Sequence, residues 1–352
     1  MKNLHRYATV FLVSLAILLA CISTAPLTFD EPAYVGAARN FIAGTPSINR
    51  EHPPLAKYFI ALSIKTFGDR TFGWRFPSAL AGALLALAVF GLTFRLTSSF
   101  HTSYVAWLLT LANGFWFVMS RVAMLSIFEL AFEAAAVWVF MIAVHERNTR
   151  WFAWSGALFG LSIGCRWCGI VGLLVCLAYA LLYYRPFFKI TAIMTATAIS
   201  VYVLSWIPLL VREHRTARYF LSANAFIYEF HRHAKGDPRL GEMWWSWIFR
   251  FHPQPSLFYL VGNPIIAIFG LAASAVLLWQ KKFLLPALYI AHVAQWAIGI
   301  KPLTFYYYYF EAFTWLTVAL AVAMQGVSIK RVRLDVVATA SALAVFVSRF
   351  QR

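Results

Sequence analysis

Charged residues are scarce in this 352-residue sequence. Asp, Glu, Lys and Arg together make up 12% of it, whereas hydrophobic types make up 61%. Soluble domains usually carry about 25% charged residues, so a soluble dehydrogenase or hydrolase is excluded. Apolar runs near or above about 20 residues, the length that crosses a hydrocarbon core of about 30 Å, recur along the whole chain. The sequence therefore predicts a polytopic integral membrane protein.

Acidic residues are the rarer of the two charge signs. The chain has 13 Asp and Glu against 30 Lys and Arg, which gives a net charge of +17. The basic residues are scattered among the loops between apolar runs instead of being grouped on one soluble face, so a nucleic-acid partner is not expected. Anionic membrane lipids are the expected partners of these charges.

Cysteine, repeats and glycine-rich loops are also rare or missing. The sequence has four cysteines, and Cys165 and Cys168 have the spacing of half a zinc site without a second pair or a histidine cluster beside them. We expect no metal and no cofactor. No internal repeat, low-complexity tract or nucleotide-binding glycine loop is visible. The chain is expected to form one membrane domain over residues 1–352.

The predicted fold is an all-α membrane bundle of about eleven spans. The apolar runs place these spans at 8–26, 72–94, 100–120, 122–144, 151–165, 167–184, 187–211, 257–279, 283–300, 305–327 and 333–348. Two further helices are predicted to lie at the outer interface, over 32–41 and 52–68. The second of these is apolar, but it is short and opens with two prolines.

Orientation follows from the short loops, because Lys and Arg close to span ends are retained in the cytoplasm. With the amino terminus inside, every predicted inner loop is basic. The first loop, 27–71, and the long loop 212–256 then lie on the non-cytoplasmic side. The total number of basic residues favours the opposite orientation, because twelve lie inside and eighteen lie outside or at the outer rim. Long loops, however, cross the membrane largely regardless of their charge. Trp244, Trp245 and Trp247 indicate that part of the long loop rests at the headgroup level.

Two adjacent carboxylates, Asp30 and Glu31, follow the first predicted span. Two adjacent carboxylates at a membrane surface lose favourable hydration free energy, and their negative charges repel each other. One interpretation is helix capping, because Pro32 suits the first helical position and acids there complement the helix dipole. The other is a general base that faces a hydroxyl acceptor. The residues alone do not decide between the two.

Cationic side chains gather on the same predicted side. His52, before Pro53 and Pro54, is expected at a helix amino terminus, where it would either bind an anion such as phosphate or cap its own helix. Arginines at span ends are usually paired, and a lipid-linked phosphate is a natural partner, although each alone could instead reach lipid headgroups. These arginines are Arg75, Arg121 and Arg166.

Other polar and aromatic groups lie in or beside the spans. Glu129 and Glu133, at i and i+4, share one face of the fourth span, where packing against Arg or Tyr of a neighbouring helix is expected rather than catalysis. Tyr307 and Tyr308 begin the tenth span as an aromatic belt or, alternatively, as a wall that contacts sugar or prenyl groups. Lys57 is a further candidate for that wall.

These residues, in this order, resemble the protein O-mannosyltransferase family, a branch of the C-type glycosyltransferases that also contains the aminoarabinose transferases acting on lipid A. The resemblance covers almost the whole chain. It rests on Phe29-Asp30-Glu31, His52-Pro53-Pro54-Leu55-Ala56-Lys57, Arg75, Ser120-Arg121 with Met124-Leu125, Arg166-Trp167-Cys168-Gly169, Gly262-Asn263-Pro264 and Phe305 with Tyr306–Tyr309.

The sequence departs from the family pattern at several positions. Ala56 replaces a glycine, Ser126 stands where an acid often follows Met-Leu, Arg166 replaces a lysine, and Tyr308 and Glu311 stand where His and Pro are usual. The large lumenal domain of the eukaryotic members has no counterpart in 212–256. These departures bear mainly on the choice of acceptor.

The resemblance implies an inverting transfer of a hexose, most naturally mannose, from a polyprenyl-phosphate carrier to a hydroxyl acceptor, with the active site on the non-cytoplasmic face of the plasma membrane. It implies that Asp30 takes the acceptor proton and that Glu31 helps to position the acceptor. The leaving phosphate would be steadied by the cationic residues His52, Arg75, Arg121 and Arg166.

Three functions remain open at this point. The first is transfer to Ser or Thr of a protein, and the second is transfer to a lipid or polysaccharide. A transporter or structural membrane protein is the third. A transporter would place its charges along a path at the midplane, often with repeat symmetry, whereas here they gather at one rim.

Overall fold

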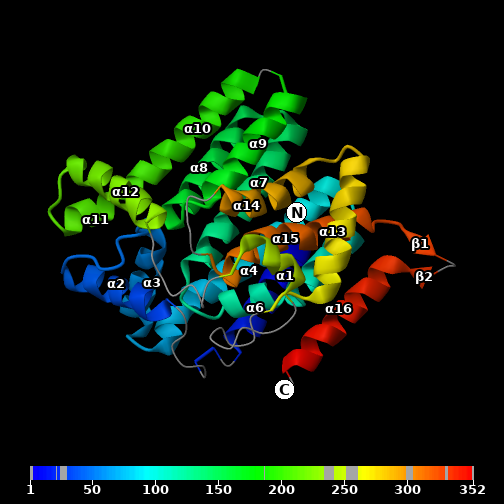
Figure 1. Ribbon diagram of the computed structural model, residues 1–352, viewed down its shortest axis with the longest axis horizontal. Coiled ribbons are helices and arrows are strands. Elements are labelled where there is room, and N and C mark those ends of the chain that lie inside the picture. Colours follow the sequence, from blue (N-terminus) through cyan, green and yellow to red (C-terminus); the bar gives the residue numbers. More distant parts are fainter. Residues whose placement is uncertain are drawn as a thin grey trace.

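A helix forms at each of the eleven predicted spans (Figure 1). The computed structural model describes residues 3–20, 22–23, 30–185, 187–233, 242–250, 261–298, 304–329 and 332–350. Phe29, Cys21, Lys301 and parts of the loop 212–256 lie outside these ranges. The span helices have the bounds α1 Leu4–Leu19, α4 Thr71–Thr97, α5 Phe100–Leu111, α6 Gly114–Met119, α7 Leu125–Glu146, α8 Thr149–Cys165, α9 Gly169–Tyr183, α10 Phe187–Leu204, α11 Ile207–Arg212, α13 Pro264–Trp279, α14 Leu284–Ala297, α15 Phe310–Ala323 and α16 Leu334–Phe350.

Two predicted spans are broken helices. The run 100–120 divides into α5 and α6 at Asn113, whose side chain caps α6 by accepting from the Phe115 amide. The run 187–211 divides into α10 and α11, and Pro208 lies in the first turn of α11. Side chains that cap a new helix, and prolines at its first turn, favour such restarts inside an apolar run.

Three of the described helices are long and apolar enough to cross a membrane by themselves, namely α4, α7 and the run 187–212. Five shorter apolar helices accompany them. The all-helical bundle is thus observed, whereas the count of eleven crossings stays a prediction.

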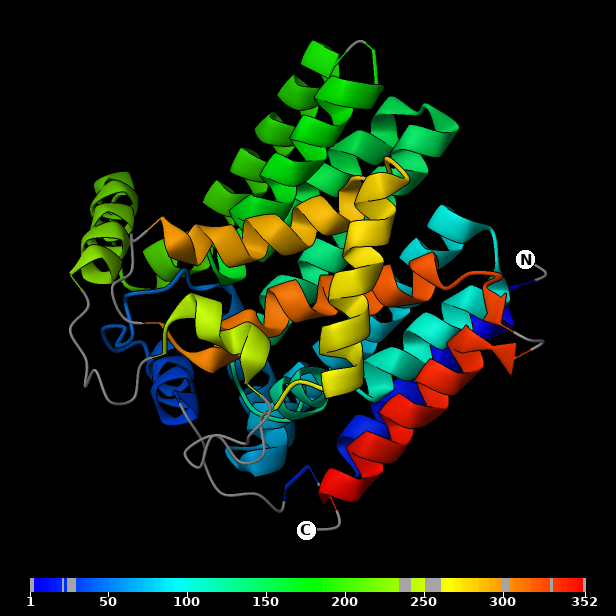
Figure 2. The same ribbon diagram turned by 45° about the vertical axis from the view of Figure 1, so that its right-hand side comes forward.

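Helix α4 lies at the centre of the bundle and packs against α1, α5 and α7. Close packing here requires small residues. A Cβ on Gly82 would lie 2.2 Å from the Ser120 hydroxyl oxygen, so the glycine lets the end of α6 approach α4. On the other side of the molecule α13, α14 and α15 pack together, and Figure 2 shows α13 crossing α15 steeply.

Asn263 joins three helices at one point. Its side-chain oxygen caps α13 by accepting from the Ile265 amide, 3.0 Å away. Its amide nitrogen donates to the carbonyls of Ala112, at the end of α5, and Ala342, in α16. The residue is buried, so it satisfies backbone groups that no water reaches.

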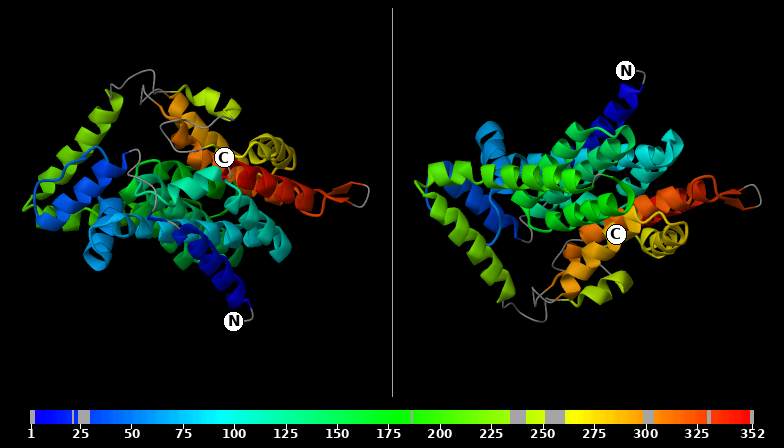
Figure 3. Two further views of the ribbon diagram at one scale, coloured as in Figure 1. Left: turned by 90° about the horizontal axis from the view of Figure 1, so that it is seen from below. Right: turned by 90° about the horizontal axis from the view of Figure 1, so that it is seen from above.

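Four elements lie outside the bundle, on the side that the sequence predicts to be non-cytoplasmic. These are α2 Glu31–Ala43, α3 Leu55–Phe67, α12 Ala217–Arg232 and the 3-10 helix η1 Trp244–Phe249. The first two show that helices form over the predicted ranges 32–41 and 52–68, whereas their position at the membrane interface stays a prediction. Figure 3 shows α12 at one end of the molecule, beyond α2 and α3. Trp245 of η1 is exposed as expected at a headgroup level, but Trp247 is buried against Trp296 and Tyr309, because the long loop folds back onto the bundle.

A small hairpin interrupts the otherwise helical chain. Strands β1 Ser328–Ile329 and β2 Val332–Arg333 pair antiparallel, with Ser328 opposite Arg333. A second 3-10 helix, η3 Tyr306–Tyr309, leads into α15.

Candidate active site

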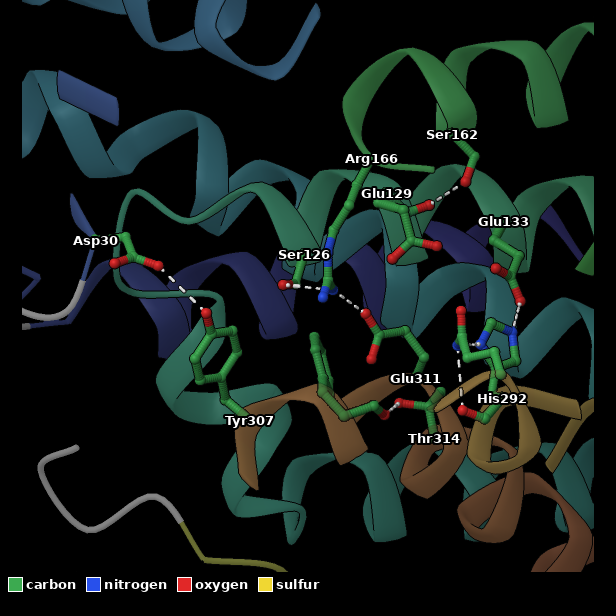
Figure 4. A network of polar contacts seen from close by, with 12 residues as sticks. Asp30, Ser126, Glu129, Glu133, Ser162, Arg166, His292, Tyr307, Glu311 and Thr314 are labelled. Carbon is green, nitrogen blue, oxygen red and sulfur yellow. Dashed lines mark hydrogen bonds and ion pairs between the residues drawn. The ribbon is translucent and has the colours of Figure 1, made fainter. Parts of the chain in front are cut away.

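Asp30 lies immediately before α2 and is exposed. Its carboxylate accepts hydrogen bonds from the Tyr307 hydroxyl at 3.2 Å and, more weakly, from the Tyr34 hydroxyl at 3.5 Å. Figure 4 shows the Asp30 and Tyr307 side chains directed toward each other. The carboxylate makes no hydrogen bond that caps α2. Capping of α2 by a side-chain hydrogen bond to Asp30 is therefore not observed, and the general-base role stays a prediction.

Glu31 has the opposite environment to its neighbour. Its carboxylate accepts from Nε and Nη2 of Arg75, at 2.8 and 2.7 Å, and from the Ala123 amide at 2.9 Å. Both members of the ion pair are fully buried, and Arg75 also donates to the Ile22 carbonyl. A buried carboxylate needs such a counter-charge. The pair fastens the start of α2 to α4.

This placement differs from the roles expected for both residues. Arg75 does not line the cavity described below, and its guanidinium is occupied by Glu31, so a direct contact with a donor phosphate has no geometric support. Glu31 is likewise fully buried and paired with Arg75, so the described part of the chain gives no contact through which it would position an acceptor.

His52 lines a cavity of about 290 Å³ together with Arg166 and His231. The His52 ring centroid is 5.1 Å from that of His231 and 6.1 Å from that of Tyr34. Helix α3 takes Pro54 as its N-cap residue, so His52 precedes the helix and does not cap it. The predicted joining of His52 and Arg166 is observed. His231 was not predicted.

Lys57 supports the His52 loop from behind. Its ammonium donates to the Asn49 carbonyl at 2.5 Å, the Asn49 side chain at 3.2 Å and the His52 carbonyl at 2.9 Å. Burial lowers the pKa of this ammonium from 10.5 to about 7, although nearby Glu51 opposes the shift. Lys57 thus holds the loop and does not form part of the cavity wall.

Arg166 ends α8 and is almost fully buried. Its Nη1 donates to the Ser126 hydroxyl at 3.1 Å and to the Glu311 carboxylate (Figure 4). The guanidinium also lies 4.9 Å from the ring centroid of Tyr308, which stacks on Trp296. Trp296 lines the cavity and Tyr308 does not, so the predicted wall role of Tyr307 and Tyr308 stays a prediction.

Arg121 lies apart from this cavity. Its Nη2 donates to the Ala20 carbonyl at 2.6 Å, and its guanidinium lies 4.6 Å from the Phe117 ring centroid. Like Arg75, it is absent from the lining of the cavity. Two of the four expected phosphate ligands, His52 and Arg166, are thus brought together, and two are not.

The two glutamates of α7 occupy buried positions, as their spacing predicted. Glu133 pairs with His292 of α14, 2.7 Å away, so its partner is a histidine and not the expected Arg or Tyr. Neither carboxylate oxygen of Glu129 has a hydrogen-bond partner among the described residues. Figure 4 shows Glu129 beside Arg166 and Glu133.

Asp30 lies outside the cavity that the basic side chains line. Asp30 contacts Tyr307, whereas Arg166, His52 and His231 line the cavity. Tyr34 contacts both Asp30 and His52, and Tyr307 packs edge-on against Tyr308. In the described ranges no group of three or more His, Cys, Asp or Glu side chains is arranged to hold a metal ion.

Comparison with known proteins matches part of the chain to one family. Residues 51–209 match the family described as dolichyl-phosphate-mannose-protein mannosyltransferase. The polyprenol-phosphate-mannose–protein mannosyltransferase of Corynebacterium glutamicum is 35% identical over 153 residues, which cover 40% of this chain and 29% of that protein. The protein of the same name from Mycobacterium tuberculosis is 29% identical over 219 residues, covering 53% of this chain and 41% of its own. The matches thus span well under half of these relatives.

Solved structures share the fold over a greater length. ArnT from Cupriavidus metallidurans, bound to undecaprenyl phosphate, superposes with a TM-score of 0.68 at 17% identity, covering 98% of this chain and 70% of its own. The Saccharomyces cerevisiae Pmt1-Pmt2 complex gives a TM-score of 0.52 at 18% identity, over 60% of this chain and 34% of that one. The chain therefore shares the fold of these solved structures, and its residues 51–209 are similar to the dolichyl-phosphate-mannose-protein mannosyltransferase family.

Proposed function

We propose that this protein is an inverting glycosyltransferase that moves mannose from a polyprenyl-phosphate carrier to a Ser or Thr hydroxyl of a protein. The observation that carries the proposal is the separation of exposed Asp30 from the cavity lined by His52, Arg166 and His231. The names of the mannosyltransferase relatives support the sugar and the acceptor.

The chemistry requires both halves of this arrangement. Asp30 takes the proton of the acceptor hydroxyl as its oxygen attacks the anomeric carbon, and the bond from that carbon to the phosphate oxygen breaks. The electron pair of this bond leaves with the polyprenyl phosphate, whose negative charge Arg166, His52 and His231 stabilise. Attack from the side opposite the phosphate inverts the configuration. Tyr307 and Tyr34 orient the base through their hydroxyl groups.

We place this reaction at the non-cytoplasmic face of the plasma membrane, in a bundle of eleven spans. The basic inner loops support the orientation. The donor's prenyl chain and the surrounding membrane lipids are the remaining partners. We propose that no organic cofactor is required, because the lipid-linked sugar is itself a substrate and the basic side chains of the cavity would stabilise its phosphate; the assay with EDTA decides whether a divalent cation is needed.

Purified protein in detergent, incubated with radiolabelled polyprenyl-phosphate mannose, tests the function. The acceptors are a Ser/Thr-rich peptide, the same peptide with every Ser and Thr replaced by Ala, and a total lipid extract. Label on the first peptide alone is expected, with or without EDTA. Label on the lipid fraction alone would instead establish the lipid-acceptor function, and no label on any acceptor would contradict both.

A further inference from the structure

The Arg166 guanidinium is held at one nitrogen. Every hydrogen bond that this side chain makes to the described part of the chain runs through Nη1, to Ser126 and Glu311. The planar group rests against Tyr308 and Trp296, with 4.9 and 5.8 Å to the ring centroids. Since Arg166 also lines the 290 Å³ cavity, its other edge is left for an anion there.

Glu311 is the charged anchor of that nitrogen. It lies in the first turn of α15, is fully buried, and its second carboxylate oxygen has no hydrogen-bond partner within the described ranges. A carboxylate buried in a membrane bundle is costly unless it is paired, and Arg166 is the cation that it contacts. The ion pair therefore fixes the guanidinium more firmly than the neutral bond from Ser126 does.

Three departures from the family pattern meet at this point. Ser126 stands where an acid often follows Met-Leu, Arg166 replaces a lysine and Glu311 stands where proline is usual. Ser126 lies 40 positions before Arg166 in the chain, and Glu311 lies 145 positions after it. The side chain of Arg166 nevertheless contacts both. The carboxylate that is missing at position 126 is supplied from α15.

We propose that Glu311 is a positioning residue for the phosphate of the donor. It holds Arg166 by Nη1 so that the opposite edge of the guanidinium faces the cavity, and a carboxylate at position 126 would do the same. The inference rests on the proposed function, because it takes the anion in the cavity to be the lipid-linked phosphate.

Binding of a polyprenyl phosphate to the purified protein in detergent tests this role. Glu311→Gln keeps the shape of the side chain and removes its charge, so affinity is expected to fall about tenfold or more. Adding Ser126→Asp to this variant returns a carboxylate to Nη1 and is expected to restore affinity to within about threefold of the unmodified protein. Glu133→Gln is the matched control, because it changes another buried carboxylate, which contacts His292 instead of Arg166.

The thermal midpoint of each variant is measured alongside. Glu133→Gln is expected to lower the midpoint and leave affinity unchanged. A Glu311→Gln variant with a lowered midpoint and unchanged affinity would show a merely structural residue and overturn the inference. So would a folded double variant that still binds weakly.

Two further outcomes are distinguishable. If the unmodified protein binds no polyprenyl phosphate, the proposed function fails, whereas equal binding by the unmodified protein and Glu311→Gln removes only the positioning role. If Glu311→Gln does not fold, Ser126→Ala is measured instead, because the Ser126 hydroxyl accepts from the same Nη1 of Arg166. Loss of one neutral hydrogen bond is expected to weaken binding about threefold, and unchanged affinity would overturn the inference.

Discussion

Glu31 and Arg75 form a bidentate ion pair in which Nε and Nη2 lie 2.8 and 2.7 Å from the two carboxylate oxygens, and neither side chain is exposed. The pair links α2 to α4 across 44 residues of sequence. It places a buried, paired carboxylate directly beside an exposed one, since Asp30 precedes Glu31 and accepts from Tyr307.

Arg75→Met is expected to destabilise the protein by about 3–5 kcal/mol, because it leaves the Glu31 carboxylate buried without its counter-charge. The double variant with Glu31→Gln is expected to recover part of this loss. Thermal unfolding in detergent measures both. Arg70→Met, at an exposed arginine before α4, is the control. If Arg75→Met bound the donor more weakly at an unchanged thermal midpoint, Arg75 would instead be a ligand of the donor phosphate.

Asp30→Asn is expected to lower turnover by about 10²–10⁴-fold, because the amide keeps the shape of the side chain but does not accept the acceptor proton. Donor affinity is expected to stay the same. Asp69→Asn is the control, since Asp69 is an exposed carboxylate paired with Arg39 away from the cavity. Near-normal turnover of Asp30→Asn would remove the general base from the proposed mechanism.

His52→Ala and His231→Ala are each expected to weaken polyprenyl-phosphate binding by about tenfold or more, because both side chains line the cavity beside Arg166. Arg121→Ala is expected to leave binding unchanged, since that guanidinium contacts Ala20 and Phe117 instead. Equilibrium binding of the purified variants gives the comparison. The reverse order of effects would place the phosphate beside Arg121.

Lys57 predicts a pH dependence of stability. Burial lowers its pKa to about 7, from 10.5, so between these values the unfolded chain binds one proton more than the folded protein does. The free energy of unfolding therefore rises with pH in this window, by up to about 1.4 kcal/mol per pH unit. Comparing unmodified protein with Lys57→Met from pH 7 to 9 isolates this contribution, which is expected to be absent from the variant. Parallel pH profiles would contradict it.

Single cysteines test the orientation, in a background without Cys21, Cys165, Cys168 and Cys176. An impermeant thiol reagent applied to intact cells is expected to label Ser47→Cys and Ser222→Cys. It is expected to label Ser98→Cys and Asn148→Cys only after the membrane is opened. Ser98, Asn148 and Ser222 are exposed, and Ser47 is half-buried in the loop before α3. The opposite pattern would invert the proposed topology.

The positions of the helices were predictable because apolar runs and turn residues are local signals. The helices α2 and α3 and the position of His52 close to Arg166 also followed from the sequence. The breaks at Asn113 and before Pro208 did not, because an apolar run continues through both.

The pairing of site residues was the least predictable part. Arg75 resembled a rim arginine, and only the tertiary fold brings Glu31, 44 residues away, against it. His231 lies on a helix in the long loop, and its position opposite Glu51, 180 residues earlier, is set by how that loop folds back. Sequence spacing carries no information about contacts of this kind.

Asn263 is a structural residue, so its presence indicates the fold and not the proposed chemistry. One amide nitrogen serves carbonyls of two helices while the oxygen caps a third. Asp lacks the donor and Ala lacks both groups, so neither could replace it without leaving buried backbone groups unsatisfied. In a distant relative, a Gly-Asn-Pro tripeptide would therefore indicate this fold even if the carboxylate at the position of Asp30 had been lost. An inactive descendant would be expected to keep Asn263 longer than Asp30.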